Sequence, residues 1–89
     1  MTMEGRQSDE YSAWTRAVRI RDGNKCQFPN CKKRTRLEVH HIIPWSKSAI
    51  LRHDVSNGIC LCRAHHKSIK GKENYYVGLF NVIISAKKK

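Results

Sequence analysis

Apolar side chains recur at helical spacing near the start of the chain. Tyr11, Trp14 and Val18 follow one another at intervals of three and four residues, so they fall on one face of a helix. Ser8 can cap the first turn, and the two acidic residues after it suit the positive end of a helix dipole. The pattern stops at the Asp-Gly pair of residues 22–23. We interpret the aromatic stripe as the side of this helix that packs on the core.

The middle of the chain has the shorter period of β-strands. Residues 37–39 (Leu-Glu-Val) alternate and predict a strand, which residues 42–45 (Ile-Ile-Pro-Trp) continue until the proline breaks it. Residues 46–56 are mostly polar and predict a long loop with room for one helical turn. The Asn-Gly pair at 57–58 is a strong turn signal, and residues 59–61 predict a short second strand.

The last part of the chain returns to longer elements. Residues 62–70 predict a helix that ends at Gly71. Residues 75–84 are apolar and fit either a strand or a helix, and we expect them to cover the core. Short strands followed by helices predict a small α+β fold. The chain therefore divides into a disordered segment 1–7, one domain 8–84 and a basic tail 85–89.

A chain of 89 residues has room for one domain with a small core, and domains of this size often need a disulfide or a bound metal ion for stability. The four cysteines and five histidines could provide such a cross-link. No apolar run approaches the roughly 20 residues of a membrane span, and residues 1–10 lack the apolar stretch of a signal peptide. We therefore expect a cytoplasmic protein, in which cysteines bind metal or stay reduced rather than form disulfides.

The charge of the chain is strongly positive and unevenly distributed. The formal net charge is +11, from 18 basic and 7 acidic side chains. Residues 26–89 hold thirteen of the basic and only three of the acidic ones, so the cysteine-containing part is also the cationic part. Such a field attracts polyanions, of which nucleic acid is the commonest. An acidic membrane surface would be attracted as well, so charge alone does not decide between the two.

Two short pairs of cysteine and histidine predict a structural zinc site. The candidate ligands are Cys26, Cys31, Cys62 and His65. The first pair flanks a tight turn, and the second pair lies three residues apart on one face of the predicted helix. Cys60 is an alternative to Cys62, and His66 is an alternative to His65. A closed site with four protein ligands has no open position for a substrate, so it supports folding and not catalysis.

A second cluster of polar residues remains after the zinc ligands are set aside. It contains His40, His41, Asn57 and His66. Adjacent side chains on a helix diverge by about 100°, so His66 faces a different site from His65. Adjacent side chains on a regular strand point to opposite sides, so His40 and His41 share a pocket only where the strand ends or twists. Spacing alone is equally compatible with solvent-exposed histidines.

The order of these motifs resembles the HNH endonuclease family. The resemblance is carried by residues 39–44 (VHHIIP), 57–59 (NGI) and 61–66 (LCRAHH). Residues 14–26, with Arg-Asp-Gly before the first cysteine, are similar to small HNH proteins of phages and prophages. In all it covers about residues 11–72. It implies a small ββα-metal (His-Me finger) fold stapled by a structural zinc, with an additional N-terminal helix.

The resemblance also implies a role for each residue of the second cluster. His41 matches the first histidine of the family name and would be the general base that activates water. Asn57 matches the asparagine and would hold the loop that orients the base. His66 matches the last histidine, and it would bind the catalytic metal together with His40. The products would carry a 3′-hydroxyl and a 5′-phosphate.

One position departs from the family pattern. Many members have aspartate before the base, where this chain has His40. Two imidazoles form a softer site than a carboxylate with an imidazole, which favours Mn²⁺, Ni²⁺, Co²⁺ or Zn²⁺ over Mg²⁺. Good activity with Mg²⁺ would indicate a nearby carboxylate, for which Asp54 is the first candidate. His53 is a lesser alternative ligand.

The remaining basic residues are candidate contacts to DNA phosphates. They are Lys32, Lys33, Arg34, Arg36, Arg63, Lys67 and Lys70. No segment resembles a base-reading element, so we expect little sequence specificity.

The alternative function is a zinc-knuckle module that binds nucleic acid without cutting it. Small phage proteins of this type also suggest a place beside a terminase during DNA packaging. One active site cuts one strand per encounter, so double-strand cleavage would need a dimer or two encounters.

Overall fold

The computed structural model describes residues 8–87. The predicted disordered segment 1–7 and the last two residues of the predicted tail, 88–89, lie outside this range. The elements are helix α1 (Asp9–Arg21), strand β1 (Leu37–His41), 3-10 turns η2 (Trp45–Lys47) and η3 (Val55–Asn57), strand β2 (Gly58–Cys62), helix α2 (Arg63–Ser68) and helix α3 (Glu73–Ala86). No helix within this part of the chain is both long and apolar enough to cross a membrane.

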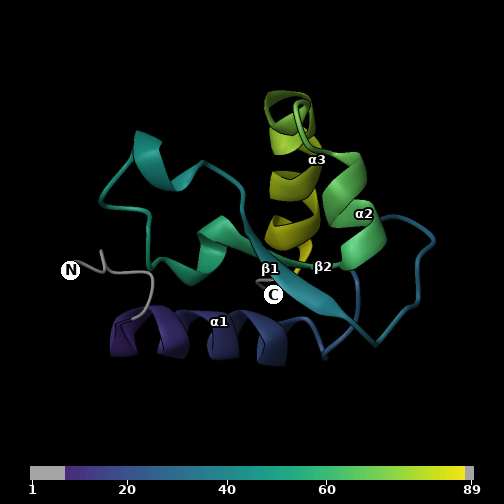
Figure 1. Ribbon diagram of the computed structural model, residues 1–89, viewed down its shortest axis with the longest axis horizontal. Helices are drawn as coiled ribbons and strands as arrows, with labels where there is room; N and C mark the ends of the chain where they lie inside the picture. The colour runs from purple at the N-terminus through teal and green to yellow at the C-terminus, as the bar shows by residue number, and fades with distance from the viewer. Residues whose placement is uncertain (1–7, 88–89) are drawn as a thin grey trace.

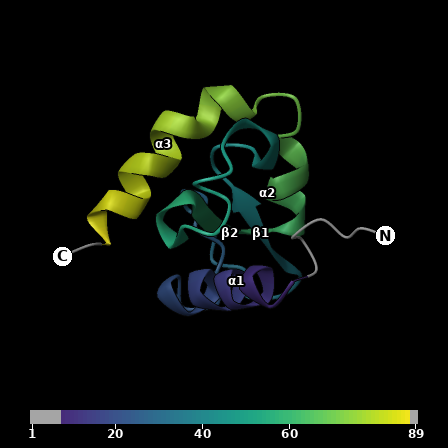
Figure 2. The same cartoon turned by 90° about the vertical axis from the view of Figure 1, so that its left-hand side faces the viewer.

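The two strands form the middle layer of the molecule. They pair antiparallel, with Leu37 opposite Cys62 and His41 opposite Gly58. Helix α1 lies along one face of this hairpin, while α2 and α3 lie on the other side (Figures 1 and 2). The α+β fold class is therefore confirmed, and the hairpin followed by α2 has the ββα order of the predicted metal-binding fold.

Helix α1 forms as the sequence predicts. The Ser8 hydroxyl accepts a hydrogen bond from the Tyr11 N–H at 3.1 Å, which caps the helix. Trp14 and Val18 are buried against the hairpin. They lie so close to Gly58 that a Cβ there would stand 2.6 Å from Val18 Cγ2 and 2.7 Å from Trp14 Cζ2. This position therefore has no room for any side chain larger than that of glycine.

Three boundaries differ from the sequence-based expectation. Strand β1 ends at His41 instead of continuing through residues 42–45, because the Ile43 N–H donates its hydrogen bond to the side chain of Asn57. The Asn-Gly pair at 57–58 joins η3 to β2 and is not itself a hairpin turn. Helix α2 ends at Ser68, two residues before the end of the predicted helix, and the chain then turns at Gly71 with φ +84°.

Residues 75–84, which fit either a strand or a helix, belong to α3. This helix runs to Ala86, past the start of the predicted tail at residue 85. Its buried side chains Phe80 and Ile84 lie one helical turn apart, and they pack in the same core cluster as residues of β2. The core cluster consists of Cys26, Ile42, Ile59, Leu61, Cys62, Ile69, Phe80 and Ile84. Because two of the predicted zinc ligands belong to it, the metal cluster and the core are continuous.

Candidate metal centre and active site

The four predicted zinc ligands converge on one point. One ligand atom from each of Cys26, Cys31, Cys62 and His65 lies within 4.8 Å of the others. The His65 Nδ1 atom is 3.3 Å from the sulfur of Cys62 and 3.8 Å from that of Cys26. Ligands on a tetrahedron with arms of about 2.3 Å stand about 3.8 Å apart, so the spacing suits Zn²⁺. The donor set and its geometry therefore fit a structural zinc ion.

Local structure brings the two ligand pairs together. Between the first two cysteines the chain turns sharply, with the Cys31 N–H donating to the Phe28 carbonyl at 3.0 Å. The Phe28 ring stacks on His65 at a centroid distance of 4.2 Å and an angle of 7°, which fixes the imidazole plane. Cys62 ends β2 and caps α2, where its sulfur accepts the N–H of His65. Each ligand is thus positioned by an element boundary.

The thiol pKa values show why this cluster needs a cation. Burial raises the pKa of Cys26 to about 11, so its thiolate is unfavourable without an adjacent positive charge. Burial also disfavours the Cys62 thiolate, but hydrogen bonds from His65 and the neighbouring thiols lower its pKa overall. Cys60, the alternative ligand, lies outside the cluster and is fully buried. Burial raises the pKa of Cys60, as does the nearby Asp22 carboxylate.

His40 and His41 point to opposite faces of β1, as adjacent residues of a strand must. The His41 ring stacks on Trp14 of α1 at 4.0 Å, while the His40 ring lies 5.2 Å from His66 of α2 and 5.7 Å from Phe80 of α3. Nevertheless both line one hollow of about 1100 Å³. Within residues 8–87 no other strand pairs with the outer edge of β1, which leaves this edge of the sheet open.

His40 and His66 form a pair suited to a metal ion. The Nε2 atom of His40 is buried and makes no hydrogen bond to any residue from 8 to 87. Burial and the nearby His66 lower the pKa of His40 to about 4, so the ring is neutral at pH 7 and keeps a lone pair. The Nδ1 atom of His66 is 2.6 Å from the Glu38 carboxylate. That bond leaves Nε2 of His66 as the atom for a ligand.

His41 lies in a cage of aromatic and backbone groups. Its Nε2 atom is 2.9 Å from the Arg52 carbonyl, and because a carbonyl only accepts, this nitrogen carries the proton. The basic lone pair is therefore on Nδ1. The Arg52 side chain is itself fixed, since its Nε donates to the Trp45 carbonyl and its guanidinium lies over the Trp45 ring.

Asn57 holds the loop that builds this cage. Its side chain accepts from the Ile43 N–H at 2.8 Å and donates to the carbonyls of Ile43 and Leu51 at 3.1 and 3.3 Å. Ile43 lies two residues after His41, and Leu51 directly precedes Arg52. The amide of Asn57 thus ties together the two chain segments that fix the position and tautomer of His41.

A comparison with known protein families finds a match. The model of a family described as HNH endonuclease matches residues 22–70, which is more than half of the chain. The chain belongs to the HNH endonuclease family. No curated protein and no solved structure matches it significantly. Members of the family are generally nucleases that act on DNA and use a divalent metal ion, so a nuclease-type function follows for this chain.

The matched segment of this HNH protein contains the zinc cluster and the second cluster, but not all of the hollow. Trp14, which supports His41, comes from α1, and Glu73 comes from the start of α3. Glu73 lines the hollow together with His40 and His66. Sequence reasoning missed both Glu38 and Glu73. Glu38 had one usable signal, because it lies two residues before His40 in β1 and therefore on the same face.

The other ligand candidates of this HNH protein do not line the hollow. The Asp54 carboxylate caps η3 and accepts from Ser56. The Nδ1 atom of His53 lies 3.8 Å from Glu10, while its Nε2 atom is buried without a hydrogen-bond partner within residues 8–87. Of the predicted DNA-contacting residues, Lys33, Arg36, Arg63 and Lys67 surround a second, smaller hollow. Arg34 donates to the Gly23 carbonyl at 2.8 Å, while the exposed Lys32 and Lys70 do not line either hollow.

Proposed function

We propose that this protein is an HNH endonuclease that hydrolyses DNA phosphodiester bonds with a divalent ion held by His40 and His66. The observation that carries the proposal is the hollow at the edge of β1, onto which both faces of the strand open. The proposal is supported by His40, whose buried Nε2 has no hydrogen-bond partner within residues 8–87, and by His41, whose Nε2 contacts the Arg52 carbonyl, since both residues line this hollow. A nuclease needs a metal ligand and a general base next to one phosphate.

In the proposed reaction, His41 acts as the general base. Its Nδ1 lone pair takes a proton from water, and the resulting hydroxide attacks the phosphorus. The bond between phosphorus and the 3′ oxygen then breaks, and the leaving 3′ oxygen takes a proton from water. This gives the 5′-phosphate and 3′-hydroxyl products that the family resemblance implies. Arg52, through its carbonyl, and Asn57, through the loop, keep the base in position.

His40 and His66 would hold the catalytic ion from two different elements. The His40 nitrogen is available because burial keeps the ring neutral, and Glu38 fixes the orientation of His66. A bound ion would stabilise negative charge on the phosphate and on the leaving oxygen. We expect Mn²⁺, Ni²⁺, Co²⁺ or Zn²⁺ to serve better than Mg²⁺, because both ligands are imidazoles. A separate Zn²⁺ in the Cys₃His cluster would be structural.

DNA is the proposed substrate, with contacts from the basic residues Lys32, Lys33, Arg36, Arg63, Lys67 and Lys70 and with little sequence preference. Arg34 belongs to the same basic segment, although its guanidinium also braces the backbone at Gly23. Participation in phage DNA packaging beside a terminase is supported only by the resemblance to small phage proteins. It is a proposal about context and does not affect the chemistry.

The deciding experiment is cleavage of supercoiled plasmid. Protein freed of its catalytic ion, with the Cys₃His cluster kept loaded, would be supplied with Mg²⁺, Mn²⁺ or Ni²⁺. We expect the wild type to nick the plasmid, and His41→Ala to be slower by about 10²–10⁴-fold, the usual contribution of a general base. His41→Gln serves as a second variant, because its amide can still donate to the Arg52 carbonyl.

Zinc content and DNA affinity are measured in every variant, which separates a folding defect from a catalytic one. If the wild type retains zinc and binds DNA but does not cut it with any of the three metal ions, the protein is a zinc-knuckle binding module instead. Equal turnover with Mg²⁺ and Mn²⁺ would contradict the two-imidazole site and would point to Glu73 as a carboxylate ligand, since Glu73 lines the same hollow.

A further inference from the structure

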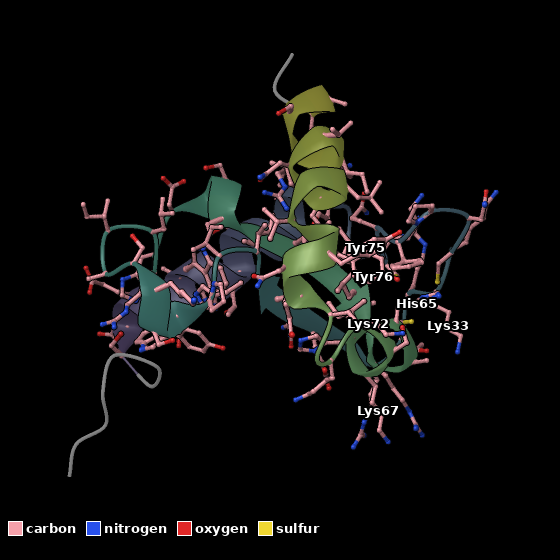
Figure 3. All side chains as sticks on the ribbon, turned by 90° about the horizontal axis from the view of Figure 1, so that it is seen from above. Lys33, His65, Lys67, Lys72, Tyr75 and Tyr76 are labelled. Carbon is pink, nitrogen blue, oxygen red and sulfur yellow. The ribbon has the colours of Figure 1, made fainter. Side chains whose placement is uncertain are left out.

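Four cationic side chains surround a hollow that is separate from the active site. This hollow measures about 320 Å³ and is lined by Lys33, Arg36, Arg63 and Lys67, with Thr35 and Cys62 among the other residues. None of the lining residues is acidic. Lys33 and Lys67 extend outward from the part of the molecule that carries His65 (Figure 3).

The four cations have no acidic partner within the part of the chain that the structure describes. Within residues 8–87, none of their charged groups forms an ion pair or donates a hydrogen bond to another residue. Arg34, in the same basic segment, differs because its guanidinium donates to the Gly23 carbonyl. Like charges that gather around one hollow repel one another unless an anion enters it. The arrangement therefore favours an anionic ligand.

The backbone holds the two walls of the hollow together. The Arg63 N–H donates to the Arg36 carbonyl at 2.9 Å, and the Cys26 N–H donates to the Lys33 carbonyl at the same distance. Arg36 has a φ of 54°, a left-handed conformation that non-glycine residues seldom adopt. One wall follows Cys31 in the chain and the other follows Cys62, so the Cys₃His cluster positions both.

We propose that this hollow binds a phosphate of the DNA backbone other than the one being cleaved. Guanidinium groups bind phosphate through paired hydrogen bonds, and the ammonium groups add charge. That the phosphate belongs to DNA rests on the proposed function.

Helix α2 sets the distance between the two phosphates. Lys67 follows His66 directly and faces the cationic hollow, while His66 faces the active site. A helix with its side chains is about 10 Å across. One strand of DNA carries a charge about every 3.4 Å along the axis. Because this spacing is only the rise along the axis, a separation of about 10 Å corresponds to a phosphate at most three nucleotides from the scissile bond, or to one on the opposite strand.

The test measures DNA binding against salt, without added divalent ions, so that no cleavage is needed. The probe is a fluorescent 20-base-pair duplex followed by anisotropy from low to moderate KCl. The double variant Arg63→Gln/Lys67→Gln is compared with Arg16→Gln/Lys25→Gln, which removes the same charge away from the hollow. We expect the slope of log affinity against log salt to become shallower by about 0.9 for each phosphate that the protein no longer neutralises. The control variant should retain the wild-type slope.

Two further measurements identify the ligand. Titration of inorganic phosphate should shift the amide resonances of Thr35, Arg36 and Arg63 in the wild type and not in the double variant. Cleavage of a 20-base-pair duplex should show a raised KM in the double variant, while the control variant Arg16→Gln/Lys25→Gln should keep the wild-type KM.

Equal slope changes in both double variants would overturn the inference, because the effect would then be one of overall charge. Phosphate-induced shifts without any change in the DNA slope would also overturn it, because the hollow would then take free phosphate. The slope change can appear even if no protein cuts DNA. In that case the phosphate site stands, and the proposed nuclease activity fails separately.

Discussion

The chemistry of each histidine in the second cluster depends on what its ring nitrogens already contact. His41 donates one N–H to the Arg52 carbonyl, and His66 has one nitrogen held by the Glu38 carboxylate. These contacts fix the orientation of both rings. Within residues 8–87, the buried Nε2 atom of His40 has no hydrogen-bond partner, which is costly in a folded protein unless a ligand uses it. Three identical side chains thus have three different surroundings.

The Glu38–His66 contact gives a prediction at this scale. Glu38→Ala should weaken Mn²⁺ binding at the His40–His66 site by about 10- to 100-fold, because the carboxylate holds the His66 ring in its orientation. Calorimetric titration of Mn²⁺ into zinc-loaded protein measures this directly, and Glu38→Gln should recover part of the affinity. Glu10→Ala is the control, since it removes an equal charge from an exposed position. An equal loss in the control would show that overall charge, not positioning, is responsible.

At the scale of elements, the free edge of β1 determines the site. A third strand at that edge would separate the two faces, and His40 and His41 could not share a hollow. Helix α1 supports one face through Trp14, while α2 and α3 supply His66 and Glu73 to the other. The close contact between α1 and the hairpin at Gly58 holds the helix in place against β2.

Two glycines test how tightly these elements pack. Gly58→Ala should destabilise the protein by about 1–3 kcal/mol, because the new methyl group would overlap Val18 and Trp14. Gly78→Ala is the matched control, since it lies within α3 with no atom near the new Cβ. That change should stabilise the protein by about 0.4–1 kcal/mol, through lower entropy of the unfolded chain. Urea unfolding of both variants measures the difference. Similar free energies of unfolding would contradict the close packing of α1.

Local patterns in the sequence predicted the elements that local interactions determine. Helix α1 has a cap, a periodic stripe and a stop signal, and the two ligand pairs have the short spacings of a metal site. Residues 75–84 were ambiguous because apolar residues dominate the segment, so neither period stands out. Glu38 was missed because its partner His66 lies 28 residues away. The cage around His41 likewise depends on contacts between distant segments.

At the scale of the whole molecule, the Cys₃His cluster links the site, the core and the cationic hollow. Cys26 and Cys62 belong to the core cluster, and Cys62 also lines the hollow of Lys33, Arg36, Arg63 and Lys67. His65 and His66 are adjacent on α2, so the helix that carries the proposed ligand of the catalytic ion is also the one that contributes to the cluster. Loss of the structural ion should therefore disturb all three parts together.

Two buried cysteines, one inside the cluster and one outside it, provide the test of this linkage. Cys26→Ala should prevent stable folding at 25 °C, because structural zinc contributes about 10–16 kcal/mol in small zinc domains, as much as a typical domain's whole stability. Cys60→Ala removes an equally buried thiol that lies outside the cluster, and it should cost only about 1 kcal/mol, as an average substitution does. Metal analysis should find one zinc ion per chain in the wild type and in Cys60→Ala, and none in Cys26→Ala. Circular dichroism during heating should show a cooperative transition only in the first two. Loss of zinc from Cys60→Ala as well as from Cys26→Ala would mean that Cys60 is a ligand in place of Cys62 and that β2 is shifted in register, which would also move Gly58 away from Trp14.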